Sequence, residues 1–488
     1  MNEAILESRL LKSKAFIANE WVDAASGKRY EVRNPATGDV VASVPDMNAS
    51  DTKRAIAAAE EAFRTWRSTT VLERSRILRR WNDLVIENVD ELARLLTTEM
   101  GKPVKEAAGE IRYGASFIEW FAEEARRVYG DVIPASAEGR RIVVIKQPVG
   151  VVGAITPWNF PNAMITRKIA PAIAAGCTAV VKPAEDTPLS ALALAALARD
   201  AGLPPGVLNI VTTSDPGSVG GELTSNPMVK KVSFTGSTEV GKLLMRQSAD
   251  TVKKVSLELG GNAPFIVFDD ADIDEAVKGA VAAKYRNAGQ TCVCANRIFA
   301  QETIYDAFVE KLAAAVKELK VGNGMQPGVT IGPLINRDGM DKVQRLVSDA
   351  VDKGAHPVVG GSRIADGDGY FFEPTVLSNV DDSMALNDEE IFGPVAPVYR
   401  FSDEADAIRR ANNTRYGLAA YFYGRDVARV WRVAEALEYG MVGINTGLMS
   451  TAEAPFGGVK ESGIGREGSK YGIEEYVEIK YLCFDAIS

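Results

Sequence analysis

Hydrophobic positions recur at two different spacings along the 488-residue chain. Between residues 51 and 127 they recur at helical spacing, as at Ile56, Ala59, Phe63 and Trp66, which predicts four consecutive helices, the first capped by Ser50 and Asp51. From about residue 141, short β-branched runs alternate with helical segments. Because this alternation is typical of parallel sheets covered by helices on both faces, it predicts an α/β fold.

Two successive α/β series are expected, with the second beginning after residue 260. From residue 141 strands are predicted at 141–147, 149–155, 178–181, 207–211, 232–234, 254–257 and, at the start of the second series, 264–268, with helices at 162–175, 187–201, 216–224 and 238–248. In the second series we expect strands at 356–360, 371–377, 395–400, 419–423 and 441–445, and helices near 272–285, 304–318 and 339–353. Strand-like runs at 131–147 and 476–484 pair either with each other or with another subunit.

Composition removes several classes of protein and of site. The net charge of −9 argues against nucleic acid or an anionic membrane as partner, and no apolar run reaches the roughly 18 residues of a membrane span. The start MNEAILESRLLKSK lacks the pattern of a secretory signal, so we expect a cytoplasmic protein. With His356 as the only histidine and four scattered cysteines, a Ser/His/Asp triad and a metal site are not expected. Catalysis must then use carboxylates, lysine, amides or a thiol.

One candidate stretch, Thr156 to Pro161, follows the strand predicted at 149–155. Two prolines stiffen the backbone around Asn159, and a rigidly held amide suits the stabilisation of an oxyanion. Alternatively, Asn159 caps a helix that begins near Pro161.

Two further turns suit a nucleotide. Lys182 and Glu185 follow a strand, where they match a ribose and a nearby phosphate, although a solvated turn is the simpler interpretation. Gly236 and Ser237 join a strand to a helix whose free N–H groups favour phosphate, although the sequence is neither GxGxxG nor a Walker motif.

Glu258 and Cys292 are the candidate catalytic pair. Glu258 ends an apolar strand, where a carboxylate is unusual unless a cleft exposes it. Cys292 follows Gly-Gln-Thr after a helix, so a turn can present its thiol; a buried, inert cysteine is the alternative. A thiol nucleophile with a carboxylate base is consistent with a histidine-poor chain.

Taken together, these stretches resemble the aldehyde dehydrogenase superfamily. PWNFP, KPAE, FTGSTEVG, LELGGN, GQTC, EEIFGP and PFGG occur in the family's order between Asn34 and Lys480, and the segments 163–168, 285–296 and 465–472 are most similar to the succinate-semialdehyde branch. The resemblance implies a Rossmann-like NAD(P)-binding domain formed by 1–127 and 149–258, and an α/β catalytic domain at 259–469. It also implies a small β oligomerisation arm, 128–148 and 470–488, in a homo-oligomer, a tetramer built as a dimer of dimers.

The resemblance also implies a mechanism. Cys292 attacks the aldehyde as a thiolate, and the oxyanion of the resulting thiohemiacetal is bound by the Asn159 amide and the Cys292 N–H. After hydride transfer to the nicotinamide, Glu258 activates the water that hydrolyses the thioester. Two alternatives remain: a cofactor-free thiol hydrolase, which leaves the nucleotide residues without a task, and a non-catalytic protein, against which the intact Cys292, Glu258 and Asn159 argue.

The family's cofactor residues fall on matching positions here. The implied set is Thr156, Trp158, Lys182, Glu185, Gly236, Ser237, Leu259, Glu390 and Phe392. In it, Lys182 and Glu185 lie at the adenosine ribose, and Glu390 and Phe392 lie at the nicotinamide end. The Glu185 carboxylate would repel a 2′-phosphate, so NAD is preferred, although Lys182 remains able to bind that phosphate of NADP.

For the substrate, the resemblance implies that Arg167, Arg286 and Ser450 bind the distal carboxylate of succinate semialdehyde. Glutarate semialdehyde, or a broader range of ω-carboxy or aliphatic aldehydes, is the alternative, and both arginines could instead be structural ion-pair partners. Cys294 lies two residues after Cys292, as in relatives where the pair oxidises. A C-x-C disulfide is strained and easily reduced, so Cys294 is a candidate redox partner.

Overall fold

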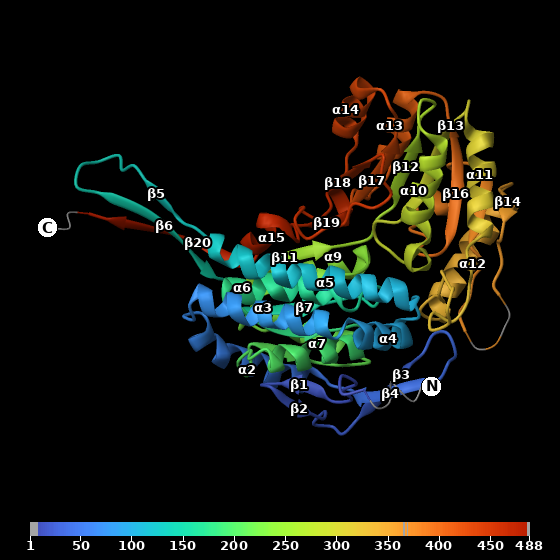
Figure 1. The fold of residues 1–488 in the computed structure, drawn as a ribbon. Helices are drawn as coiled ribbons and strands as arrows, with labels where there is room; N and C mark the ends of the chain where they lie inside the picture. Colours follow the sequence, from blue (N-terminus) through green and yellow to red (C-terminus); the bar gives the residue numbers. More distant parts are fainter. Residues whose placement is uncertain (1–7, 365–366, 368, 486–488) are drawn as a thin grey trace.

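The two predicted α/β series form two separate sheets (Figure 1). The computed structural model describes residues 8–364, 367 and 369–485. Residues 1–7, which belong to the segment examined for a secretory signal and to the first predicted domain, lie outside the described residues, as do 486–488 of the predicted arm.

The first sheet has a parallel centre with antiparallel edges. Its order is β19-β11-β10-β7-β8-β9-β1-β2, with β19 Gly463–Ile464, β11 Lys254–Glu258, β10 Val229–Thr235, β7 Val151–Ile155, β8 Thr178–Lys182, β9 Leu208–Ile210, β1 Ala15–Ile17 and β2 Glu20–Val22. Strands β7 and β8 are buried along their whole length, which explains the apolar sequence of β7 and the apolar centre of β8. Because β19 pairs with β11, this sheet also includes residues beyond the predicted boundary at 258.

Within the described residues, eight helices accompany this sheet. Four come from the N-terminal region and four from the connections between its strands. They are α2 Ala49–Trp66, α3 Val71–Glu87, α4 Val89–Met100, α5 Val104–Glu124, α6 Ala163–Ala175, α7 Pro188–Asp200, α8 Pro216–Ser225 and α9 Thr238–Ser248. The four predicted N-terminal helices are confirmed, but the cap of the first was placed two residues too late. Asn48 accepts the N–H groups of Ser50 and Asp51, while Asp51 accepts the Asn48 N–H, which is a capping box.

The second sheet forms the other lobe of the molecule. Its order is β14-β15-β16-β13-β12-β17-β18, with β14 His356–Val359, β15 Thr375–Val380, β16 Val395–Phe401, β13 Ala295–Gln301, β12 Ala263–Val267, β17 Ala419–Tyr423 and β18 Met441–Ile444. Its helices are α10 Ile273–Tyr285, α11 Tyr305–Lys317, α12 Arg337–Asp352, α13 Glu404–Asn412 and α14 Val427–Ala436, and α15 Ser469–Glu474 follows near the arm. Strand β13 and helices α13 and α14 were not predicted from the sequence.

Two small antiparallel sheets complete the fold. Strands β3 Arg29–Arg33 and β4 Val40–Pro45 form a hairpin. The predicted unpartnered runs pair with each other, as β5 Asp131–Ile133, β6 Arg141–Pro148 and β20 Val477–Phe484, and project from the body as an arm (Figure 1). Within the described part of the chain, no helix is long and apolar enough to span a membrane.

Candidate active site

The order of strands in the first sheet creates a crevice between β7 and β10. The chain runs from β7 through β8 to β9 on one side, whereas β10 and β11 lie on the other side of β7. Ligands of open α/β sheets bind at such a switch point, outside the carboxyl ends of the strands. Those ends lead directly into the predicted motifs at Thr156, Lys182, Gly236 and Glu258.

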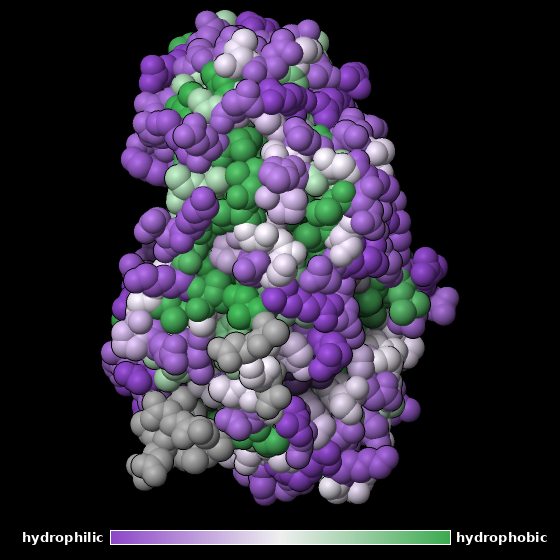
Figure 2. Space-filling model, turned by 90° about the vertical axis from the view of Figure 1, so that its right-hand side faces the viewer, coloured by the Kyte–Doolittle hydropathy of each residue, from purple (hydrophilic) through white to green (hydrophobic). Residues whose placement is uncertain are grey.

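A cavity of about 410 Å³ lies in front of these strand ends. On the face drawn in Figure 2, apolar side chains gather in an upright hollow in the middle of the molecule. The cavity brings together most of the predicted site residues: Trp158, Asn159, Arg167, Gly236, Ser237, Leu259, Arg286, Cys292, Glu390, Phe392 and Ser450. Thr156, Lys182, Glu185, Glu258 and Cys294 do not line it.

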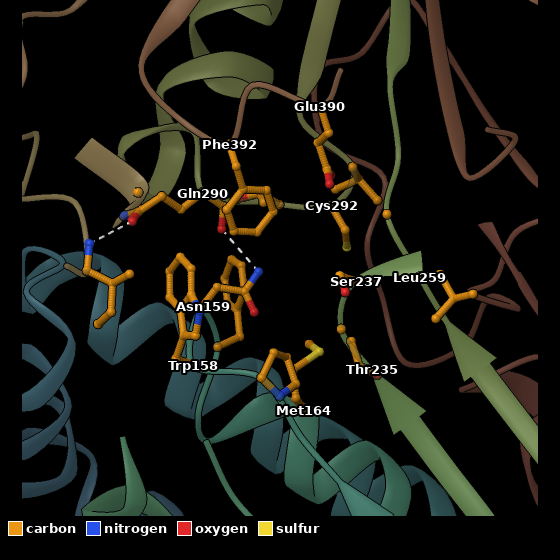
Figure 3. A pocket seen from close by; sticks show the side chains of 18 of the residues that line it. Trp158, Asn159, Met164, Thr235, Ser237, Leu259, Gln290, Cys292, Glu390 and Phe392 are labelled. Atoms are coloured by element: carbon orange, nitrogen blue, oxygen red, sulfur yellow. Dashed lines mark hydrogen bonds between the residues drawn. The ribbon is translucent and has the colours of Figure 1, made fainter. Parts of the chain in front are cut away.

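The thiol of Cys292 is presented by an unusual turn after α10. Asn287 and Ala288 both adopt left-handed conformations, with φ of 54°. Gly289 follows with φ of 75°, and a Cβ there would lie 2.1 Å from the Gly393 carbonyl oxygen. The turn directs the Cys292 sulfur into the space between Asn159 and Ser237 (Figure 3). Cys292 therefore lines the cavity and is partly exposed, and its role as the nucleophile stays a prediction.

The pKa of the Cys292 thiol is raised to about 12, mainly because burial disfavours the thiolate. The charges of Arg167 and Arg286 oppose this rise, whereas those of Glu390 and Glu258 add to it. In this state the thiol is protonated at neutral pH, so its attack on a carbonyl requires a proton acceptor.

Asn159 faces the thiol from the loop that follows β7. Its Nδ2 donates a hydrogen bond of 3.1 Å to the Gln290 carbonyl, which leaves the second N–H of the amide for another acceptor (Figure 3). Helix α6 begins at Ala163 and has Asn162 at its cap position, so the alternative in which Asn159 caps this helix is wrong. The amide is thus held beside the residue that precedes Thr291 and Cys292.

Glu258 lies at the end of β11, next to the cavity but not on its wall. Its carboxyl group faces Gly457, where a Cβ would come within 3.0 Å of Oε1. Burial raises the pKa of Glu258 well above its usual value, and the nearby charge of Glu467 adds to the rise. Its Oε2 is buried without a hydrogen-bond partner among the described residues.

The residues predicted to hold the nicotinamide half of a dinucleotide form one wall of the cavity. Trp158 and Phe392 pack edge to face, with ring centroids 5.4 Å apart. Burial raises the pKa of Glu390 to about 7, and its Oε1 accepts the Gly261 N–H at 3.1 Å. A Cβ on Gly260 would lie 3.0 Å from Glu390 Oε2, so glycine keeps this space open. An open cradle with a carboxylate and aromatic rings fits a nicotinamide riboside.

The phosphate and adenosine ends fit as well. Ser237 is the cap residue of α9, whose first N–H groups face the crevice side of the sheet. Lys182 and Glu185 lie at the end of β8, beside Thr156, whose N–H donates to the Lys182 carbonyl at 3.1 Å. The two side chains form an ion pair of 3.0 Å in which Lys182 is buried and Glu185 is half exposed. Both therefore lie outside the cavity, along the same edge of the sheet.

The two predicted substrate arginines have different surroundings. Arg167 is buried and forms an ion pair with Glu467, which also pairs with Lys168. Nevertheless, Arg167 Nη2 has no hydrogen-bond partner within the described part of the chain. Arg286 forms no ion pair with any described residue, and its guanidinium lies 5.4 Å from the centre of the Phe160 ring. Arg167 is thus in part a structural ion-pair partner. Arg286 is not one among the described residues.

Tyr113 and Glu467 are among the residues of the site that were missed in the sequence. Tyr113 lines the cavity, and its buried hydroxyl has no partner among the described residues. It lies on α5 at helical spacing from Phe117, so its pattern is that of a core residue. Glu467 was seen only as part of a family motif, and the side chain that it neutralises lies 300 positions earlier in the chain, at Arg167.

Cys294 is buried behind Cys292, and its thiol donates to the Lys284 carbonyl at 3.3 Å. It is a free cysteine in this structure, and its role as a redox partner stays a prediction. Among the described residues, no cluster of three histidine, cysteine, aspartate or glutamate side chains could hold a metal ion.

Comparisons with known proteins agree with this geometry. The sequence model described as "Aldehyde dehydrogenase family" matches residues 21–482. The chain is 62% identical to a glutarate-semialdehyde dehydrogenase of Pseudomonas putida and 60% identical to an NADP(+) succinate-semialdehyde dehydrogenase of Escherichia coli, in each case over 98% of both chains. The solved structure of a succinate-semialdehyde dehydrogenase from Burkholderia pseudomallei is 61% identical, with a TM-score of 0.97 over 98% of this chain and 99% of that one.

Proposed function

Since the chain belongs to the aldehyde dehydrogenase family and is an NAD(P)-dependent aldehyde dehydrogenase, we propose that it oxidises succinate semialdehyde to succinate. The observation that carries this proposal is the composition of the cavity. It contains a thiol and an amide that suit attack on an aldehyde, together with two guanidinium groups, Arg167 and Arg286, that suit a carboxylate. An acidic protein needs such a local excess of positive charge to bind an anionic substrate.

In this mechanism each residue acts where its surroundings prepare it. The Cys292 thiol passes its proton to solvent water and attacks the aldehyde carbon as a thiolate. The free N–H of Asn159 and the Cys292 N–H bind the oxygen as it becomes negative. A nicotinamide held by Trp158, Glu390 and Phe392 would supply the hydride acceptor for this oxidation. Glu258, whose raised pKa makes it a stronger base once it is ionised, takes a proton from the water that hydrolyses the thioester. Arg167, Arg286 and Ser450 hold the distal carboxylate meanwhile.

Arg286→Met tests the carboxylate site. Losing one partner of a buried charge pair costs about 2–5 kcal/mol, so KM for succinate semialdehyde should rise by roughly 30-fold or more. KM for butanal, which has the same chain length without the carboxylate, should change little. Arg363→Met, on the surface beside Asp341, is the matched control. Equal effects on both aldehydes would remove the carboxylate site.

Glutarate semialdehyde is the second candidate, because one relative that is 62% identical carries that name. It has one methylene more than succinate semialdehyde, which is worth about 1–3 kcal/mol in a fitted pocket. The values of kcat/KM for the two semialdehydes decide between them. We expect the higher value for succinate semialdehyde, and the reverse order would assign the longer substrate.

NAD is the preferred cofactor in this proposal. The half-exposed carboxylate of Glu185 can accept from ribose hydroxyls and would repel a 2′-phosphate, and its ion pair with Lys182 competes for the cation that such a phosphate needs. The Escherichia coli relative is named for NADP(+), so steady-state kinetics with both cofactors is the test. We expect a higher kcat/KM with NAD, and Glu185→Ser should shift the ratio toward NADP.

The arm supports the proposal of a homo-oligomer. Tyr129, Val132, Ile479 and Tyr481 are 60–80% exposed there, which is unusual for apolar side chains on neighbouring strands. We propose that the arm packs against another copy of the chain, in a tetramer. Sedimentation of the intact protein and of the Val132→Lys/Ile479→Lys variant tests this, and an unchanged tetramer in the variant would place the interface elsewhere.

A further inference from the structure

The backbone of Asn159 is held by a buried ion pair. Its carbonyl oxygen accepts a hydrogen bond of 2.7 Å from Lys102 Nζ, and Lys102 in turn pairs with Glu110 at 2.6 Å. Both side chains are only 1% exposed. The other carboxylate oxygen of Glu110 accepts the N–H groups of Asn162 and Ala163, at 2.9 and 3.3 Å. The pair therefore grips the loop at Asn159 and again where α6 begins.

The same support reaches the loop that presents the thiol. Glu106, one turn before Glu110 on α5, accepts the Asn287 N–H at 3.0 Å. The Asn287 side chain donates to the Asn159 carbonyl at 3.0 Å and to the Gln290 carbonyl at 3.1 Å. Asn159 itself donates to that Gln290 carbonyl. Residues at the start of α5 thus contact both the loop that carries the Asn159 amide and the loop that leads to the thiol.

Stability alone does not require this arrangement. Replacing a buried ion pair with neutral side chains of similar volume is often neutral or even stabilising. The pair instead fixes an orientation. Because one N–H of the Lys102 ammonium is bound to Glu110, the direction of another N–H is set. This N–H donates to the backbone carbonyl of Asn159, the residue whose side-chain amide faces the thiol.

We propose that Lys102 and Glu110 are positioning residues, which hold the Asn159 amide where the oxyanion forms. This inference rests on the proposed role of Asn159. A misplacement of about 1 Å in such a site costs up to roughly a hundredfold in rate.

A double-mutant cycle tests the proposal. Lys102→Met/Glu110→Gln removes both charges without leaving one of them unpaired. In the otherwise wild-type enzyme we expect kcat to fall by roughly tenfold or more with little change in KM, because the loss affects the transition state. In the Asn159→Ala enzyme the same pair of substitutions should lower kcat less than about twofold, since residues that act through one group are not additive.

The controls separate positioning from folding. Lys231→Met/Glu475→Gln removes another lysine–glutamate pair, of 3.3 Å, in which Lys231 is buried and Glu475 is 28% exposed. This pair touches neither loop, and its removal should leave kcat unchanged. Thermal unfolding of every variant reports the fold, and the nearly isosteric Glu110→Gln replaces the double variant if that one does not fold. An equal fall of kcat in both backgrounds would overturn the inference. If Asn159→Ala alone leaves kcat unchanged, the proposed role of Asn159 fails instead.

Discussion

Two groups of buried charges flank the cavity, and they differ in their balance. Lys102 and Glu110 are one cation and one carboxylate, with the remaining hydrogen-bonding capacity directed to backbone groups. In the second group, Arg167 and Lys168 share the single carboxylate of Glu467. The first group is neutral as a whole and suits the holding of a loop. The second has a cation in excess and suits the binding of an anion.

The largest effect is expected from Glu467→Gln, which leaves two buried cations without their carboxylate. Removing one partner of a buried ion pair costs about 3–5 kcal/mol, so we expect a loss of about that size in the free energy of unfolding. Urea unfolding at neutral pH measures it. Glu123→Gln removes a carboxylate from a half-exposed pair with Arg79 and should cost no more than about 1 kcal/mol.

The difference in the free energy of unfolding between wild type and Glu467→Gln should depend on pH. Burial alone would raise the pKa of Glu467, but the charges of Arg167 and Lys168 outweigh burial and hold it below its usual value. A carboxyl whose pKa is depressed by folding contributes stability above about pH 4.3, and this contribution is lost as the pH falls through the folded value. The difference in unfolding free energy between the two proteins should therefore become smaller at acid pH. If Glu467→Gln loses no more unfolding free energy than Glu123→Gln does, the carboxylate of Glu467 does not stabilise the second group.

Arg167→Met should affect binding more than stability. It leaves Lys168 and Glu467 as a one-to-one pair, so the unfolding free energy should fall clearly less than in Glu467→Gln. The excess cation is lost, however, and KM for succinate semialdehyde should rise by roughly tenfold or more while KM for butanal changes little. Unfolding and steady-state kinetics on the same preparations check both parts. A stability loss as large as that of Glu467→Gln, with no selective effect on KM, would make Arg167 a structural partner.

Much of the fold could be predicted because its local patterns agree with its tertiary packing. The buried strand β7 has a continuous apolar sequence, β8 has an apolar centre, and the N-terminal helices show clear periodicity. Strand β13 was missed since Asn296 and Arg297 interrupt its apolar sequence. Both are buried, and Arg297 donates to three carbonyls and a tyrosine hydroxyl, from Asn262, Arg410, Ala411 and Tyr439. Such compensation by distant groups leaves no local pattern.

The site divides in the same way. Residues in turns directly after strands, such as Asn159 and Ser237, could be found because topology gathers strand ends at one edge. The partners of those residues could not. Lys102 and Glu110 lie next to and on helix α5, far along the chain from the loop and helix start that they contact, and Tyr113 lines the cavity from the same helix. Nothing in a helical pattern separates a residue that faces a site from one that faces the core.

The smallest effect is expected from Tyr113→Phe, which removes a hydroxyl beside the second group. Burial raises the pKa of Tyr113, and the charges of Arg167 and Arg286 oppose the rise, so this hydroxyl stays protonated and can donate to a carboxylate between the two arginines. Its loss should raise KM for succinate semialdehyde about 3- to 10-fold, the worth of one hydrogen bond of about 1 kcal/mol. Tyr399→Phe is the matched control, since that hydroxyl is also buried without a partner among the described residues but lies in β16, away from the cavity. Both variants should be as stable as wild type or slightly more so, because each loses an unsatisfied polar group. Equal KM values in the two variants would show that Tyr113 does not bind the substrate carboxylate.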